Sequence, residues 1–438
     1  MYKLSKYNYL LEDNSKFIYF NGMTGAIFAM NSNEHQKMSS LWEDITTFSQ
    51  NYKSVFERFV EWGFFLPEDI DEIDRLRYNN KTAVFSNKFY RLIMNPTTDC
   101  IFNCWYCNQH SQDKGGMTEE VRRKILKHID YMVNVDRITG LHLDWFGGEP
   151  LMYFYETMVP ISEYAMELAA KNNIPFINQV TTNGYLIDKK MVKKMKDLKL
   201  NTFQITLDGD EKRHNKIRNV QGQPSFQRIF ENINLILDKI PEVHITLRIN
   251  YDDSTLKVSN FDSVFKLIPE QYRKRVYISL QRVWQTVEKN ETGIGDQDLV
   301  QLRNYALDLG YSASETSAFH AGRPVKCYAD KLYNTVIDYD GKIYKCTVHT
   351  NKEAGNLNED GSIKWNNDTL TRLYAKPPFE NAQCLACKHL PICLGTCTQN
   401  HSGSSEKPVR CSLEYADIDV DSFIKSLLKN KKSFAVVK

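Results

Sequence analysis

The sequence lacks several features that would place it in a specialised class of protein. No apolar run approaches the ~20 residues that a membrane-spanning helix needs. The start of the chain, Met1 to Leu10, is polar and aromatic, so no secretory signal is visible. The 56 Lys and Arg residues nearly equal the 54 Asp and Glu residues, so the net charge of +2 gives no general footprint for nucleic acid. We therefore expect a soluble, cytoplasmic protein that binds neither nucleic acid nor a membrane.

The composition that is present is that of a globular protein, with 42% apolar and 25% charged residues. At ~150 residues per domain, the 438 residues suggest two or three domains. The pattern changes twice along the chain and predicts three of them: residues 1–85, residues 86–312 and residues 313–438. The last has little periodic apolar pattern, so we expect metal clusters to hold it together in place of a conventional core.

The ten cysteines are grouped, and none falls between residues 108 and 326. Cys100, Cys104 and Cys107 form a C-x3-C-x2-C cluster. A disulfide framework suits small secreted domains rather than a chain of this length without an export signal. Iron–sulfur or metal ligation explains the grouping better. Zinc is the nearest alternative, because C-x2-C pairs hold both kinds of centre. Three thiolates on a four-iron cluster, however, leave one iron open to chelate a small molecule.

From about Phe89 onward, strand patterns alternate with helical patterns. The expected strands are residues 91–95, 141–146, 176–180, 202–207, 244–250 and 276–280. Six β/α units predict an α/β fold with a parallel sheet, helices outside it, and a curvature toward a partial (β/α)6 TIM barrel. Eight units would close a barrel. The gap that six leave suits a bulky substrate such as a peptide.

Two motifs fall at the ends of neighbouring strands. The cysteine trio follows the first strand, where barrel active sites lie. The second strand ends in Gly147-Gly148-Glu149-Pro150. Glycines at this place let a ligand approach the backbone, and Glu149 offers a carboxylate that can hold an ammonium group.

Together these motifs resemble the radical S-adenosylmethionine (radical SAM) superfamily. The resemblance implies that the trio holds a [4Fe-4S] cluster whose fourth iron binds the methionine part of the cofactor S-adenosylmethionine, with Glu149 contacting its amino group. It implies a 5′-deoxyadenosyl radical that abstracts an unactivated hydrogen atom. The further positions that resemble cofactor contacts are Tyr106, Gly148, Thr182, Asn183, Thr206 and Arg218. Arg248 and Asn250, on the fifth strand, are candidates for facing substrate or cofactor. No catalytic base is identified.

The seven late cysteines resemble a SPASM domain. Their spacing reads Cys327-x13-Gly341-x4-Cys346, then Cys384-x2-Cys387-x5-Cys393-x3-Cys397, and ends at Cys411. The resemblance implies two auxiliary [4Fe-4S] clusters and so three clusters in all. One would use Cys384, Cys387, Cys393 and Cys411, and the other Cys327, Cys346 and Cys397.

The second auxiliary cluster has only three thiolates, so its fourth position is open to interpretation. His320 is a candidate ligand, as is water or another side chain. A thiolate of the substrate is a further hypothesis, because it would hold sulfur ready for attack by a carbon radical.

Residues 1–85 contain three short strand patterns, 6–12, 17–21 and 26–31, followed by helical patterns at 33–42 and 53–62. This order resembles the winged-helix leader-recognition domain of peptide-maturation enzymes, which pairs its third strand with an extended leader peptide. A nucleic-acid-binding winged helix is less favoured, because neither helix carries a run of Lys or Arg.

We therefore predict a radical SAM maturase that crosslinks a ribosomally made peptide, with a thioether favoured over a carbon–carbon or carbon–oxygen bond. The expected partners are a precursor peptide and an external electron donor such as flavodoxin or ferredoxin. An alternative is the oxidation of a cysteine or serine, as in sulfatase-maturating enzymes. A non-enzymatic alternative is an iron–sulfur electron carrier, but the three-cysteine site and Glu149 argue against it.

Overall fold

The computed structural model describes residues 1–42, 44–86, 89–107, 115–252, 256–283, 296–314, 319–348, 352–401, 411–416 and 419–430. The chain divides into two units. One comprises Met1–Val84, Ser317–Tyr328 and Lys376–Lys438, and the other comprises Phe85–Thr316 and Ala329–Ala375. None of the helices in the described ranges is both long enough and apolar enough to span a bilayer.

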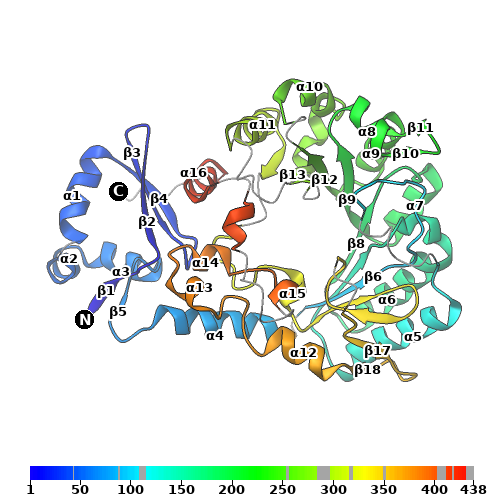
Figure 1. Cartoon of the computed structure of the whole chain (residues 1–438), viewed down its shortest axis with the longest axis horizontal. Coiled ribbons are helices and arrows are strands. Elements are labelled where there is room, and N and C mark those ends of the chain that lie inside the picture. Colours follow the sequence, from blue (N-terminus) through cyan, green and yellow to red (C-terminus); the bar gives the residue numbers. More distant parts are fainter. Residues whose placement is uncertain are drawn as a thin grey trace. The chain divides into compact units, whose positions relative to one another are not determined.

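The larger unit is built on one eleven-stranded sheet with the order β14-β13-β12-β9-β8-β7-β6-β15-β16-β17-β18 (Figure 1). Its parallel part consists of β6 (Tyr90–Met94), β7 (Leu141–Trp145), β8 (Phe176–Thr182), β9 (Leu200–Asp208), β12 (His244–Tyr251), β13 (Val276–Arg282) and β14 (Ser312–Ser314). The antiparallel end consists of β15 (Asn334–Ile337), β16 (Lys342–Tyr344), β17 (Gly355–Leu357) and β18 (Ile363–Trp365).

The helices that connect the parallel strands form one layer on the outer side of the curved sheet (Figure 1). They are α5 (Glu119–Asp130), α6 (Val159–Lys171), α7 (Lys189–Asp197), α8 (Glu211–Ile217), α9 (Phe226–Lys239), α10 (Val258–Lys266) and α11 (Asp296–Asp308). In α9, buried apolar residues recur at helical spacing, from Phe226 through Ile229 and Ile233 to Ile236. This stripe packs the helix onto a sheet whose own side chains, such as Phe203 and Leu247, are buried.

The strand order explains the barrel-like form. Each parallel strand from β6 to β13 lies beside the one before it, apart from a short polar hairpin, β10 (Asn219–Val220) and β11 (Gln223–Pro224), which forms its own two-stranded sheet. Crossovers in a parallel sheet are right-handed, so a sequential order puts every helix on the same face and curves the sheet. The predicted α/β fold with a partial barrel is confirmed.

The chain that follows the barrel strands adds to the same sheet. β15 pairs in parallel with β6, and the β15–β16 hairpin turns at Gly341, which has a φ of +84°. Its amide donates to Asp338 O at 2.9 Å. A residue with a Cβ is strained in this left-handed region, which explains the glycine in the cysteine pattern. Residues 329–375 thus belong to the sheet unit, while the predicted three-domain division stays a prediction.

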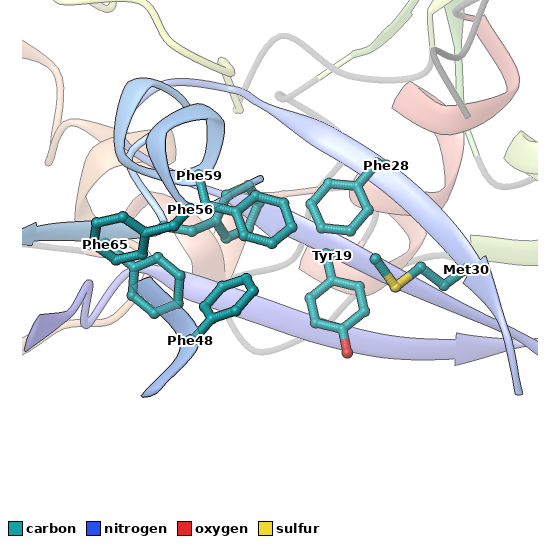
Figure 2. Close-up of a cluster of buried hydrophobic side chains, with 8 residues drawn as sticks. Tyr19, Phe28, Met30, Phe48, Phe56, Phe59 and Phe65 are labelled. Atoms are coloured by element: carbon teal, nitrogen blue, oxygen red, sulfur yellow. The ribbon is translucent and has the colours of Figure 1, made fainter. Parts of the chain in front are cut away.

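The smaller unit contains the antiparallel sheet β2 (Asn8–Asp13), β3 (Lys16–Asn21) and β4 (Ile27–Asn31). The helices α1 (Ser32–Trp42), α2 (Ile45–Asn51), α3 (Lys53–Glu61) and α4 (Glu72–Phe85) follow, and β1 (Tyr2–Leu4) pairs with β5 (Phe65–Pro67). The three predicted strands and two predicted helices are present, and α2 was not predicted. Aromatic side chains from the sheet and helices, among them Tyr19, Phe28 and Phe59, form the core shown in Figure 2.

The last part of the chain joins the first in a second apolar cluster of this unit. Tyr7 and Leu76 pack with Phe379, Leu390 and Leu394. The helices of this late segment are α13 (Ala382–Ala386), α14 (Leu390–Cys393), α15 (Thr398–His401) and α16 (Val420–Asn430). Apolar residues far apart in sequence therefore supply part of a core here, while the expectation that metal clusters hold this segment together stays a prediction.

Candidate active site

A cavity of about 720 Å³ opens at the carboxyl ends of the parallel strands. Its walls come from the loop after β6, from the ends of β7, β8, β9, β12 and β13, and from the segment after β16. The predicted site residues that line it are Cys100, Cys104, Tyr106, Cys107, Gly148, Thr182, Asn183, Thr206 and Arg218. A single cavity therefore brings together these residues, which sequence patterns selected from four separate β/α units.

The cysteine trio lies in a tight loop on one side of this cavity. Cys107 N donates to Cys104 O at 3.0 Å, and Asn183 Nδ2 lies 3.9 Å from Cys100 Sγ. Burial raises the pKa of the Cys100 thiol to about 11, and the neighbouring Cys104 and Cys107 add to the rise. Burial also raises the pKa of Cys104, although Arg218 opposes this effect. A metal centre would have to displace protons from these thiols, as thiolate ligation requires.

Gly147 and Gly148 hold the end of β7 against the backbone of the cysteine loop. Gly148 N donates to Thr97 O at 2.9 Å, and a Cβ at Gly148 would lie 2.1 Å from Asp99 O. Gly147 has a φ of +117°, and its Cβ would lie 2.4 Å from Thr97 O. These glycines therefore allow the cysteine loop, and not only a ligand, to lie close to the end of β7.

Glu149 is fully buried and is not among the residues that line the cavity. Its carboxylate accepts hydrogen bonds from Thr182 Oγ1 at 2.7 Å, Asn183 N at 2.8 Å and Leu151 N at 3.0 Å. Burial raises the pKa of Glu149, and these three donors oppose the rise. The side chain thus ties the end of β7 to the end of β8, and its predicted contact with the cofactor stays a prediction.

Tyr106 is the centre of a buried polar network that faces the trio. Its hydroxyl donates to Asp208 Oδ2 at 2.5 Å and accepts from Arg218 Nη2 at 2.9 Å and Asn250 Nδ2 at 3.0 Å. Arg218 also forms an ion pair with Asp208. Burial raises the pKa of Tyr106. Burial also disfavours the charged form of Arg218 and by itself would lower the Arg218 pKa. Asp208 and Tyr106 outweigh burial and raise this pKa well above its ordinary value.

His214, on α8, supports this ion pair from behind. Asp208 N donates to His214 Nδ1 at 3.3 Å, so the ring proton lies on Nε2, 3.1 Å from Ser225 Oγ. Ser225 Oγ donates in turn to Arg218 O at 2.5 Å. Burial, together with the charge of Arg218, holds the pKa of His214 well below its ordinary value and keeps the ring neutral.

Sequence reasoning missed His214 and several polar wall residues, namely Asn103, Gln204, Asn219, Gln221 and Arg282. A signal for some of them was present. Gln204, Thr206 and Asp208 alternate along β9, as Arg248 and Asn250 do along β12. Alternate residues of a strand share one face, so polar residues at this spacing near a strand end indicate a cavity wall.

A second group of cysteines lies in the smaller unit. Cys411 raises the pKa of both Cys384 and Cys393, Cys387 raises that of Cys384, and Cys384 raises that of Cys393. Burial raises the pKa of Cys384 and of Cys393, while Lys326 lowers both. Lys326 Nζ is held by Gly395 O at 2.7 Å and Ser412 Oγ at 2.8 Å. The four cysteines predicted for one auxiliary cluster are therefore neighbours.

The remaining late cysteines fall in different units. Cys327 and Cys397 belong to the smaller unit and Cys346 to the sheet unit, so their assignment to one cluster stays a prediction. His320 lies in the smaller unit, where its backbone amide donates to Ile392 O at 2.8 Å. All ten cysteines are free thiols.

The cysteine spacing bears on the choice between zinc and iron. Within the described ranges, no three His, Cys, Asp or Glu side chains converge tightly enough to hold a single metal ion. A zinc ion draws all of its ligands to one point, whereas each thiolate of a four-iron cluster binds a different iron atom. For the late cysteines, the choice of an iron–sulfur cluster over zinc stays a prediction.

The comparisons with known proteins agree with this site. Residues 94–261 match the family model of the radical SAM superfamily, and they span the first five barrel strands and the trio except for the start of β6. The cavity, the parallel sheet and this match define an α/β enzyme with a thiol-lined centre. More particularly, this enzyme carries a radical SAM domain at residues 94–261, as the cysteine motif predicted.

Relatives extend the similarity beyond this domain. A cysteine-type anaerobic sulfatase-maturating enzyme of Clostridium perfringens is 21% identical, with 76% of this chain and 93% of that protein covered. A serine-type enzyme of Bacteroides thetaiotaomicron is also 21% identical, with 73% and 84% covered. An uncharacterised protein of Methanocaldococcus jannaschii is 31% identical over 120 residues, and the chain covers only 39% of it.

Two kinds of solved structure share the fold. Native anSMEcpe with bound AdoMet and Kp18Cys peptide has a TM-score of 0.58 at 18% identity, covering 78% of this chain and 98% of that one. Streptococcus suis SuiB bound to precursor peptide SuiA has a TM-score of 0.53 at 16% identity, covering 91% and 96%. At these identities, the likeness is one of fold.

Proposed function

We propose that this enzyme matures a ribosomally made peptide by forming a crosslink, with a thioether as the favoured product. The observation that carries the proposal is the single cavity that gathers the trio, the glycine-supported wall and the Tyr106–Asp208–Arg218 network. Its volume of about 720 Å³ leaves room for a small cofactor and part of a substrate side by side.

The described residues fit a [4Fe-4S] cluster and S-adenosylmethionine. Cys100, Cys104 and Cys107 would hold the cluster. All three line the same wall of the cavity, which suits a three-thiolate site. Tyr106, Gly148, Glu149, Thr182, Asn183, Thr206 and Arg218 would form or support the cofactor site. When bound, these groups supply a 5′-deoxyadenosyl radical that can remove a hydrogen atom from an unactivated carbon. Arg218 provides the positive charge that a cofactor carboxylate requires.

The late cysteines are proposed to hold two auxiliary [4Fe-4S] clusters, one on Cys384, Cys387, Cys393 and Cys411 and one on Cys327, Cys346 and Cys397. Crosslinking removes two hydrogen atoms from the peptide, and the second electron needs an acceptor. An auxiliary cluster is a suitable acceptor, and an external donor such as flavodoxin or ferredoxin would reduce the first cluster. His320 or a substrate thiolate remains the proposed fourth ligand of the second auxiliary site.

Leader recognition by residues 1–85 is the proposed route of substrate capture. β4 pairs with β3 on one side only, among the strands of the described chain. A sheet edge of this kind can accept an extended peptide as an additional strand. Slower amide exchange in β4 after addition of a candidate precursor peptide would support this role, and unchanged exchange would contradict it.

The first test is anaerobic incubation of the reconstituted chain with S-adenosylmethionine and dithionite. We expect 5′-deoxyadenosine from the wild type and none from the triple variant Cys100→Ala, Cys104→Ala, Cys107→Ala. That variant should keep the iron bound by the late cysteines. A wild type that forms no 5′-deoxyadenosine, or a triple variant that does, would contradict the proposal.

Sulfatase-type oxidation is the second candidate, and the similarity over 93% of the Clostridium perfringens enzyme favours it. Mass spectrometry of a treated cysteine peptide separates the two. A thioether removes two hydrogen atoms and protects the sulfur from alkylation, whereas the oxidation product is an aldehyde that reacts with a hydrazide.

A further inference from the structure

Arg248 is a charged wall residue of the cavity that forms no ion pair with an acidic side chain in the described part of the chain. It lies on β12, two residues before Asn250, and both side chains line the cavity. Its Nε donates to Asn250 Oδ1 at 3.1 Å. No acidic side chain of the described residues forms an ion pair with it.

Asp208, the acid that acts on Arg248, already has other partners. Asp208 pairs with Arg218 and accepts from Tyr106. Burial lowers the pKa of Arg248, and the charge of Arg218 lowers it further. Tyr106 and Asp208 oppose these effects without outweighing them, so the guanidinium is only partly compensated by its described neighbours.

The other described side chains that line the cavity do not supply a negative charge either. The lining in the described part of the chain includes Arg218, Arg248 and Arg282 but no Asp or Glu. S-adenosylmethionine would bring one carboxylate together with an ammonium and a sulfonium, so its binding adds net positive charge. A [4Fe-4S] cluster held by the three thiolates would be net negative and would offset that charge, so overall neutrality does not require a second anion. A second anion is expected locally instead, because Arg248 has no acidic partner among the described residues.

We propose that Arg248 binds a carboxylate of the substrate peptide, so that the enzyme selects an acidic residue near its reaction site. The proposal rests on the proposed function, because it takes the second molecule to be a peptide. Since Nε is used by Asn250, the two terminal nitrogens of the guanidinium are left as a fork that matches a carboxylate.

The hydrogen bonds also place this acid close to the trio. Asn250 holds Arg248 through Oδ1 and donates from Nδ2 to Tyr106, the residue before Cys107. Arg248 is thus two hydrogen bonds away from the cysteine loop. The acidic residue of the peptide should therefore lie within a few residues of the one that reacts.

The test uses the full, anaerobically reconstituted chain saturated with S-adenosylmethionine. Two probes are titrated by ligand-observed NMR: N-acetyl-glutamate amide and its neutral counterpart N-acetyl-glutamine amide. The variants are Arg248→Gln and Arg248→Lys, and the matched control is Arg228→Gln, a half-exposed arginine on α9. Iron content and S-adenosylmethionine affinity are measured for each.

We expect the wild type and Arg228→Gln to bind the acidic probe about tenfold more tightly than the neutral one or better, as a charge-assisted pair permits. Arg248→Gln should bind both probes equally. Arg248→Lys keeps the charge in place and should keep only part of the preference. S-adenosylmethionine affinity should stay within about twofold, since its own carboxylate is assigned to Arg218.

A wild type without preference for the acidic probe would overturn the proposal. So would an Arg248→Gln variant that keeps the preference, or one that loses cofactor affinity instead, since the carboxylate would then be the cofactor's. Failure of the proposed function would look different, because the wild type would then form no 5′-deoxyadenosine.

Discussion

Tyr106 donates a 2.5 Å hydrogen bond to Asp208 across 102 residues of sequence. Tyr106 stands between two of the trio cysteines, and Asp208 ends β9. The hydrogen bond therefore fixes the cysteine loop to the fourth barrel strand. It does so in a buried setting, where an unsatisfied polar group is costly.

Replacing Tyr106 by Phe should loosen the cysteine loop. The hydroxyl serves Asp208, Arg218 and Asn250, so its loss leaves buried partners unsatisfied at a cost of about 1–3 kcal/mol. Amide hydrogen exchange over residues 100–107 should speed up correspondingly. As a control, Tyr272→Phe removes an exposed hydrogen bond to Asp238 and should change exchange little. Equal protection of the loop in Tyr106→Phe and the wild type would refute this role.

His214 should act as a positioning residue for Arg218. His214→Phe and Ser225→Ala each break the chain of hydrogen bonds from Asp208 N to Arg218 O. We expect each to weaken S-adenosylmethionine binding, and the double variant to weaken it by less than the sum, with a coupling of about 0.5–3 kcal/mol. Calorimetric titration measures this, and His244→Gln, an exposed histidine, is the control. Strictly additive effects would show that the two residues act separately.

Gly148→Ala should disrupt the trio site through the backbone. The new Cβ would meet Asp99 O at 2.1 Å and Thr98 O at 2.5 Å, so the loop must move, at a cost of about 1–3 kcal/mol. Iron content after reconstitution should fall by one cluster. Gly22→Ala is the matched control, because its nearest contact would be 3.4 Å. Full iron content in Gly148→Ala would argue against the tight packing.

Acid should destabilise the sheet unit through His128, which is fully buried between Tyr90 and Gly361. Its Nδ1 lies 2.7 Å from Gly361 O and its Nε2 lies 2.6 Å from the Tyr90 hydroxyl. Burial lowers the His128 pKa from 6.5 to about 4. The unfolded chain therefore takes up a proton below about pH 6.5 that the folded chain refuses. The neutral, buried His128 ring therefore makes its full contribution to the stability of the folded chain above about pH 6.5. This contribution is lost as the pH falls toward 4.

The expected loss from His128 between pH 7.5 and pH 5 is about 2 kcal/mol. Denaturant unfolding of His128→Gln over this range should show a pH dependence that is weaker by this amount. The exposed His244→Gln should keep the wild-type dependence. Identical slopes for His128→Gln and the wild type would mean that the buried ring is protonated in both states.

The barrel strands and the trio could be predicted because their signals are local. In residues 244–250, for example, apolar residues alternate with polar ones, and the strand observed is His244–Tyr251. The glycine pair marks the end of β7 in the same way. No helix is predicted at α8, by contrast. Its N-cap signal is present, since Asp210 Oδ1 accepts from Arg213 N at 2.9 Å, but only Ile217 of its seven residues is apolar, so it has no apolar stripe.

Contacts between distant segments could not be predicted. The packing of Tyr7 and Leu76 with Phe379 has no counterpart in any local pattern. The same holds for the pairing of β15 with β6, which places residues 334–337 beside the first barrel strand. The role of His214 depends on the fold of α8 behind β9. Such relationships need the three-dimensional arrangement, because a single sequence shows no pairing of residues.

The shared cluster of Tyr7, Leu76, Phe379, Leu390 and Leu394 has a consequence for biosynthesis. A ribosome makes the chain from its beginning, so Tyr7 and Leu76 emerge some three hundred residues before their partners. The barrel strands can pair while translation continues, but this cluster cannot close until the late cysteines have emerged. The packing of Tyr7 and Leu76 against their late partners is then a property of the finished polypeptide, whereas the aromatic core around Tyr19, Phe28 and Phe59 can close while the chain is still short.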